Sequence, residues 1–188
     1  MRFILLGLVW LVVAVVAGAT GATSRLQPPA PQLILLALTV SLVAAGRMVG
    51  SFRRWLMALD WRAIVGLHLL RFVGFYFLWL YRRGELPYAF AVPGGIGDVV
   101  IAVLALGLLV FSDAIDRRPQ WLLAWNALGC VDILYVVLTA TRLALAEPQS
   151  MAALLRLPLS LLPTFLVPLI IASHILLFAR LRRWERAT

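Results

Sequence analysis

Six long apolar stretches are the feature that most constrains how this chain of 188 residues can fold. Each is close to the roughly 20 residues that a helix needs to cross the hydrocarbon core of a bilayer. Hydrophobic residues make up 63% of the chain and charged residues 13%, against about 45–50% and 25% in a soluble domain. Such an excess cannot be buried in a water-facing core. We therefore predict an all-α, polytopic integral membrane protein, with six transmembrane helices in a bundle that forms a single membrane domain.

The predicted spans end at arginine clusters, prolines or glycines and cover residues 3–22, 31–50, 61–81, 94–111, 121–141 and 160–179. The first resembles a secretory signal, but it is long enough to span, so we expect a retained helix. The apolar segment 84–95 is punctuated by proline and glycine, and we expect it to fold back into the outer interface. Pro158, Pro163 and Pro168 predict a kinked or partly unwound start of the sixth span, because each removes a helical N–H donor.

The distribution of arginine predicts the orientation. All 17 basic residues are arginine. With the N-terminus inside, eleven of them lie on the cytoplasmic side, five lie outside and Arg71 lies in the membrane. Because cytoplasmic loops carry the excess of basic residues, we expect a cell-membrane protein with both termini cytoplasmic. The net charge of +9 is then explained by topology and by anionic lipid headgroups, and we expect no nucleic-acid partner.

Motifs of common membrane enzymes are missing from the sequence. It contains no His-Glu-x-x-His, no Gly-x-Ser-x-Gly and no histidine-rich boxes. Cys130 is the only cysteine, which excludes an intrachain disulfide and a thiolate metal cluster. The sequence therefore leaves open whether the protein is an enzyme. If it is one, a membrane oxidoreductase is the class that we expect.

Arg47 and Arg62 lie within three residues of a span end and are counted as cytoplasmic. Three other charged residues, Arg71, Asp98 and Asp132, lie inside the predicted spans, where charge is costly and usually functional. At about 1.5 Å per residue, Arg71 lies about 15 Å and Asp132 about 16 Å from the cytoplasmic ends of their spans. Matching depths predict an ion pair between spans three and five. It would serve as a structural clasp, as a conduction or proton-relay element, or as an anchor for an anionic group. The same count leaves Asp98 apart, near the outer face.

Two histidines lie at a nearly common depth. His68 is about 10 Å from the cytoplasmic end of its span, and His174 and Asn126 are each about 8 Å from theirs. Two imidazoles on different helices can ligate a haem b iron from opposite faces, or bind a transition metal with Asn126. The leading hypothesis is thus a small haem or metal protein with His68 and His174 as ligands and Arg71 beside the cofactor, exchanging electrons with a quinone. Alternatively, each histidine has no ligand and only forms a hydrogen bond with a neighbouring carbonyl group.

Two further hypotheses remain open. A transporter or channel for a small or anionic solute would use Arg71, Asp132 and Asp98 as its polar path. An assembly subunit would instead dock partners or lipid through its cytoplasmic arginines. Gly46 and Gly50 have the Gly-x-x-x-Gly spacing of close helix contacts, and the first two spans carry little polarity, so a homo-oligomer is compatible with each hypothesis.

Overall fold

The computed structural model describes residues 2–184, and within that range the chain is helical, with no strand. The predicted all-α fold is confirmed. Six of its helical segments are long and apolar enough to cross a membrane. Arg186, one of the arginines expected on the cytoplasmic side, lies outside the described residues.

The segments follow one another along the chain with short connections. In order, they are α1 (Arg2–Ala19), η1 (Thr23–Arg25), α2 (Ala30–Met48), α3 (Gly50–Ala58), α4 (Trp61–Leu67), η2 (His68–Val73), α5 (Gly74–Arg82), α6 (Tyr88–Val110), α7 (Ser112–Arg117), α8 (Gln120–Ala146), η3 (Pro148–Leu155), η4 (Leu162–Leu166) and α9 (Val167–Trp184). The third span consists of α4, η2 and α5, and the sixth consists of η4 and α9.

The fourth span corrects the prediction for segment 84–95. It begins at Tyr88 instead of residue 94, so most of this segment is the first part of α6 and not a fold-back into the interface. Pro93 lies inside the helix, where it removes one backbone hydrogen bond. The same turns bury Phe90 and Ala91 almost completely, and burial of these side chains offsets the lost bond.

Two other spans contain irregular helix. His68–Val73 in the middle of the third span is a 3₁₀-helix, and Leu162–Leu166 at the start of the sixth is a π-helical turn. The second of these agrees with the predicted irregular start at the prolines. Gly46 and Gly50 do not share a helix, because α2 ends at Met48 and α3 begins at Gly50.

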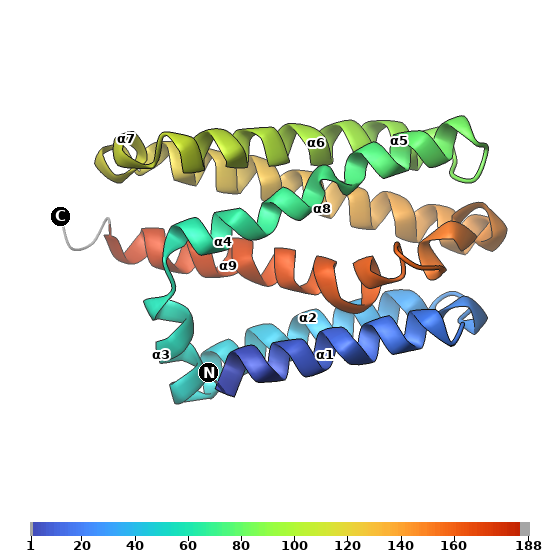
Figure 1. Ribbon diagram of the computed structural model, residues 1–188, viewed down its shortest axis with the longest axis horizontal. Coiled ribbons are helices and arrows are strands. Elements are labelled where there is room, and N and C mark those ends of the chain that lie inside the picture. Colours follow the sequence, from blue (N-terminus) through green and yellow to red (C-terminus); the bar gives the residue numbers. More distant parts are fainter. Residues whose placement is uncertain (1, 185–188) are drawn as a thin grey trace.

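The long helices run along the long axis of the molecule, and the short helix α3 lies across it at one end (Figure 1). Helix α6 packs against α4, η2, α5 and α8, whereas α9 packs against α8 and α2. Helix α1 lies at one edge of the molecule (Figure 1), where it contacts η4, and it buries only Ala14. One end of the bundle holds α3, α7 and the end of α9, and we call it the arginine-rich end. The connections α1–α2, α5–α6 and α8–η3 lie at the opposite end (Figure 1).

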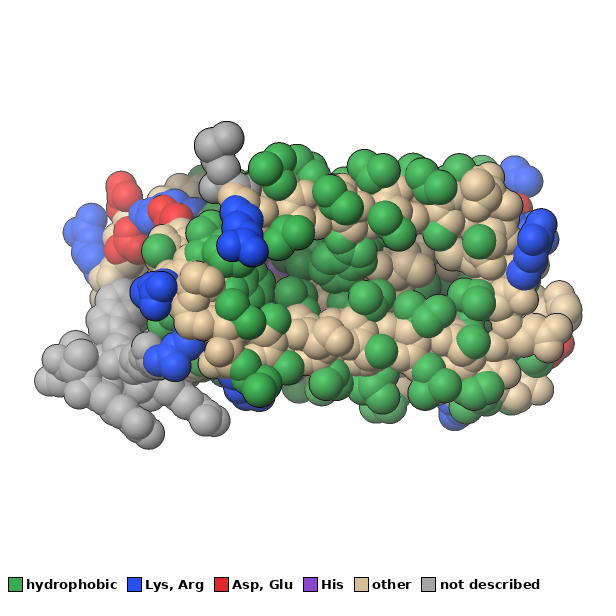
Figure 2. All heavy atoms as spheres, turned by 90° about the horizontal axis from the view of Figure 1, so that it is seen from below, with side chains coloured by type: hydrophobic (Ala, Val, Ile, Leu, Met, Phe, Trp, Pro, Cys, Tyr) green, Lys and Arg blue, Asp and Glu red, His purple; other side chains and the backbone are tan. Residues whose placement is uncertain are grey.

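Charged side chains gather at the two ends, and the face shown in Figure 2 is hydrophobic between them. Inside, the two larger apolar clusters are stacked along the bundle, and a smaller third one consists of Ile133, Val167 and Ile170. One of the larger clusters includes Val65, Ile101 and Leu177 in the arginine-rich half of the bundle, and the other includes Phe77 and Phe90 toward the opposite end. Buried polar side chains lie between the clusters, and we call them the polar layer: His68, Arg71, Asp98, Asn126, Ser173 and His174.

Candidate functional site

Arg71 is at the centre of the polar layer, with 1% of its surface exposed. Its Nε donates to Oδ1 of Asp98 at 2.7 Å, and its Nη2 donates to Oδ2 of Asp132. Its Nη1 donates to the carbonyl oxygen of Gly129 at 3.1 Å. All three guanidinium nitrogens are therefore bound by the protein. With both carboxylates ionised, the Arg71–Asp98–Asp132 triad carries a formal charge of −1.

The expected contact between Arg71 and Asp132 is present, but the expected isolation of Asp98 is wrong. Because α6 begins at Tyr88, Asp98 lies about 15 Å along its helix and not near its end. That depth matches the depth of Arg71 in the third span. The start assumed at residue 94 placed Asp98 too close to the surface by more than one helical turn.

Two glycines make room for the triad and its surroundings. A side chain at Gly97 would occupy the place of the Asp132 carboxylate. A Cβ at Gly129 would lie 2.8 Å from Cε1 and 3.3 Å from Nε2 of His174. Gly129 thus joins the two halves of the polar layer: its carbonyl group accepts from Arg71 and its Cα lies against the imidazole of His174. Sequence reasoning missed this role of Gly129.

The two histidines meet, as their depths predicted. Both have 0% exposure, and their ring centroids lie 4.5 Å apart with the planes tilted by 59°. Trp125 packs edge-on against His68 at 4.8 Å and donates its indole N–H to the carbonyl oxygen of Ile101. The imidazoles are therefore held in a closed, aromatic environment.

Hydrogen-bond directions determine which ring nitrogens carry protons. Ser173 Oγ donates to the carbonyl oxygen of Ile170 at 2.7 Å, so it accepts from Nε2 of His68 at 2.9 Å. The Asn126 amide nitrogen donates to the backbone oxygen of His174. Asn126 Oδ1 therefore accepts from Nδ1 of His174 at 2.8 Å. Nδ1 of His68 and Nε2 of His174 are left as buried nitrogens without a hydrogen-bond partner among the described residues. Ser173, which the sequence showed only as a serine in an apolar run, is thus a member of the site.

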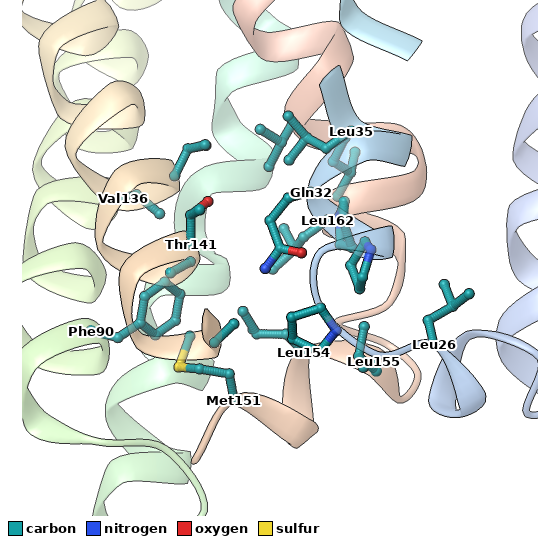
Figure 3. A pocket seen from close by; sticks show the side chains of 18 of the residues that line it. Leu26, Gln32, Leu35, Phe90, Val136, Thr141, Met151, Leu154, Leu155 and Leu162 are labelled. Atoms are coloured by element: carbon teal, nitrogen blue, oxygen red, sulfur yellow. The ribbon is translucent and has the colours of Figure 1, made fainter. Parts of the chain in front are cut away.

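A cavity of about 700 Å³ reaches the triad from the opposite end of the bundle. Arg71 and Asp98 line its inner part, and its walls are mostly apolar. Gln32, near the start of α2, projects its amide into the cavity (Figure 3). The Oε1 atom of Gln32 is buried and has no partner within the described part of the chain. Nothing in the sequence pattern distinguished this glutamine from the other glutamines near the loops.

A second cavity of about 1000 Å³ lies at the arginine-rich end, between α1, α2, α3, α4 and α9. Ser173 lines it, while Arg47 and Arg53 stand among its other lining residues. The two cavities therefore meet the polar layer from different ends of the bundle. The first reaches Arg71 and Asp98, and the second reaches Ser173, which is hydrogen-bonded to His68.

The histidine pair does not fit a haem. Two nitrogens that bind one iron from opposite faces of a porphyrin lie about 4 Å apart, since each metal–nitrogen bond is about 2 Å, and the ring centroids lie farther apart still. The centroids of His68 and His174 are only 4.5 Å apart, which leaves no room for a porphyrin between the two rings. A single metal ion needs less space. Among residues 2–184, no group of three or more His, Cys, Asp or Glu side chains is arranged to hold one.

Comparison with known proteins places the chain in a family. No curated protein and no solved structure matches it significantly. The sequence profile described as "Domain of unknown function (DUF8737)" matches residues 28–182. The match covers most of the chain and includes every residue of the polar layer, while α1 lies before it. The chain therefore belongs to the DUF8737 family.

Proposed function

We propose that the chain is an integral membrane protein with six spans and that its arginine-rich end faces the cytoplasm. The six long apolar helices and the hydrophobic flank in Figure 2 support the membrane location. The excess of arginine at the end where α1 begins and α9 ends supports the orientation.

We propose further that the protein is a transporter in which the Arg71–Asp98–Asp132 triad takes up and releases a proton. One observation carries this proposal: a single buried guanidinium is shared by two carboxylates from two helices, at the inner end of a cavity. Ionised groups within spans are expensive to retain and mark ion and substrate pathways.

The charge balance of the triad explains why a proton would bind there. With one guanidinium and two carboxylates, the triad has one negative charge in excess. Uptake of one proton by either carboxylate makes it neutral. The proton and a charged substrate would then compete for the same excess charge, which is the requirement for coupling their movements. A purely structural clasp between two helices would need only one of the two carboxylates.

The experiment is a pH jump on the reconstituted protein. Proteoliposomes adsorbed on a solid-supported membrane should give a transient current when the pH of the bath is stepped, because a proton enters a site within the membrane. We expect the current to be lost in Asp98→Asn and Asp132→Asn and to return in Asp98→Glu. Asp113→Asn, which changes an exposed carboxylate on α7, is the matched control and should keep the current. A wild-type protein without current, or a double variant that keeps it, would overturn the proposal.

A second candidate function follows from the histidine pair. Imidazole nitrogens without protons are ligands for copper, zinc, nickel and iron, and His68 and His174 each retain one such buried nitrogen. We propose a transition-metal ion as the cofactor of this alternative, with Asn126 and Ser173 fixing the two rings. Elemental analysis and an absorbance scan of purified wild type and of His68→Ala and His174→Ala test it. Metal bound to wild type and lost from both variants supports it, and metal-free wild type refutes it.

A further inference from the structure

The cavity at the opposite end offers a ligand hydrogen-bond acceptors in its buried part. Each of the three nitrogens of Arg71 already donates to Asp98, Asp132 or Gly129, and the two carboxylates outweigh the single positive charge of the guanidinium. Asp98 uses Oδ1 for Arg71, and no donor in the described part of the chain reaches its Oδ2. In the same cavity, Gln32 Oε1 is a buried acceptor without a partner among the described residues.

The electrostatics of the cavity also favour a ligand that donates hydrogen bonds and carries a positive charge. The inner end of the cavity faces the triad, whose formal charge is −1 when both carboxylates are ionised. The ionisable groups around Asp98 are Arg71 on η2, Asp132 on α8 and, beyond Gly129, the histidine pair on η2 and α9. Arg25 is the charged residue at the mouth, where its side chain is exposed and screened by solvent. A bound anion would add to the excess negative charge, whereas a bound cation would balance it.

The side chains that line the cavity indicate what kind of molecule fits beside the charged group. The walls are built mainly from leucine, valine, proline and phenylalanine side chains, including Phe90, Val136 and Leu162 (Figure 3). A volume of about 700 Å³ lies within the range of about 300–1000 Å³ of pockets for small molecules. A small hydrated ion would leave this apolar surface uncovered, so an apolar body fits better.

We propose that this cavity binds an amphipathic organic cation, a protonated amine with an apolar body, with its ammonium group against Asp98. The inference rests on the proposed function and names its substrate class. The ammonium donates to Oδ2 of Asp98 and balances the charge of the triad. Gln32 accepts from a second donor nearer the mouth. A proton on the triad removes the charge that holds the cation, so proton uptake releases the amine. The anionic solute that the sequence allowed is replaced by a cationic one because the two carboxylates of the triad outweigh the charge of Arg71.

Three ligands with one apolar body separate the alternatives. The full chain in phosphatidylcholine nanodiscs is titrated by calorimetry at pH 7.5 with 1-adamantanamine, 1-adamantanol and 1-adamantanecarboxylate. We expect the ammonium compound to bind at least about tenfold more tightly than the alcohol, as for a charge paired in a desolvated site. The carboxylate should show no saturable binding. Equal or tighter binding of the alcohol or the carboxylate overturns the inference.

Variants locate the binding. Asp98→Asn should weaken binding of the amine about tenfold or more and leave the alcohol unchanged, while Gln32→Leu should weaken binding of hydroxylated amines. Gln120→Leu, at the far end of α8, is the matched control and should bind as wild type does. Lowering the pH from 7.5 to 5.5, where the amine stays charged, should weaken its binding to wild type and not to Asp98→Asn. Unchanged amine binding in Asp98→Asn overturns the inference.

The two proposals fail separately. If pH-jump currents are present and depend on Asp98 but the amine does not bind, the substrate class is wrong and proton uptake stands. If the amine binds through Asp98 but wild type gives no current, the transporter proposal is wrong and the cavity is a cation-binding site alone.

Discussion

Among single residues, Arg71 has the most constrained position, because its guanidinium connects η2 with α6 and α8. Removing one partner of a buried ion pair leaves the other charge uncompensated, which costs about 3–5 kcal/mol. Removing Arg71 alone should therefore destabilise the fold, whereas replacing all three members of the triad with uncharged side chains should cost much less.

We therefore expect Arg71→Met to lower the free energy of unfolding by about 3–5 kcal/mol. Adding Asp98→Asn and Asp132→Asn to this variant should recover most of the loss, because no unpaired charge then remains. Unfolding in mixed micelles, followed by tryptophan fluorescence, measures both effects. The control is Arg83→Met, which breaks the exposed pair with Glu85 and should cost no more than about 1 kcal/mol. A single variant as stable as the control would contradict the expectation.

Gly129 gives a second prediction for a single position. Gly129→Ala places a Cβ 2.8 Å from the His174 ring and should destabilise the protein by about 1–3 kcal/mol, as overpacking does. Gly107→Ala is the matched control in α6, since nothing lies within 4 Å of its Cβ, and alanine is a better helix former than glycine by about 1 kcal/mol. Thermal unfolding of the two variants should move in opposite directions. Equal shifts of the two unfolding temperatures would show that the His174 ring moves aside and accommodates the added methyl group.

Between elements, α4 and α7 are joined by an exposed contact at the arginine-rich end. Trp61 Nε1 donates to Oδ1 of Asp116 at 2.9 Å, and Arg62 Nη2 donates to Oδ2 at 2.5 Å. These two hydrogen bonds lower the pKa of Asp116 below its ordinary value of 3.8, and the one from Trp61 has the larger effect. The ionised carboxylate is thus favoured in the folded protein.

A lowered pKa makes the contact dependent on pH in a defined direction. Its contribution to stability is fully present above the unfolded pKa, 3.8, and is lost as the pH falls through the lower folded value. We expect Asp116→Asn to be less stable than wild type at pH 6 and to approach wild type when both are measured below pH 3.8. Asp113→Asn serves as the comparison with an exposed carboxylate on the same helix. A stability difference that persists unchanged in acid would exclude this contact as its source.

The positions of the polar residues could be predicted only as well as the helix boundaries. Arg71 and Asp132 were paired correctly because the starts predicted for their spans, residues 61 and 121, lie within one residue of α4 and α8. The depth of Asp98 could not be predicted, because proline and glycine at positions 93–95 indicate a helix start there, whereas α6 begins at Tyr88 and stays helical through Pro93. The sequence placed His68, His174 and Asn126 at a similar depth, but the hydrogen bond between His68 and Ser173 could not be predicted, because it depends on the rotation of α9 about its axis.

For the whole molecule, composition determines most of the fold. A chain with so few charged residues can satisfy its backbone in lipid only by forming helices or a closed barrel, and the lengths of the apolar stretches favour helices. The number of helices long enough to cross a membrane, and their approximate limits, follow directly. The cavities do not follow, because they depend on how six helices pack, and no periodicity in the sequence encodes that.

The proposed orientation predicts which end is accessible from outside the cell. In a Cys130→Ala background, a cysteine at Gln149 should react with a membrane-impermeant maleimide in intact cells, because η3 lies at the opposite end. A cysteine at Ser51, on α3, should react only after the membrane is permeabilised. Both positions are exposed, so accessibility of the side chain itself is matched. The reverse labelling pattern would invert the orientation.

The 3₁₀-helix at His68–Val73 has a mechanical consequence for the bundle. A 3₁₀-helix rises about 2.0 Å and turns about 120° per residue, whereas an α-helix rises about 1.5 Å and turns about 100°. If these six residues relaxed to α-helical geometry, the span would shorten by about 3 Å, and α5 would rotate relative to α4 by about a third of a turn. Arg71, which lies within this segment, would then turn away from both carboxylates. The helical geometry of this segment is therefore coupled to the hydrogen bonds of the guanidinium.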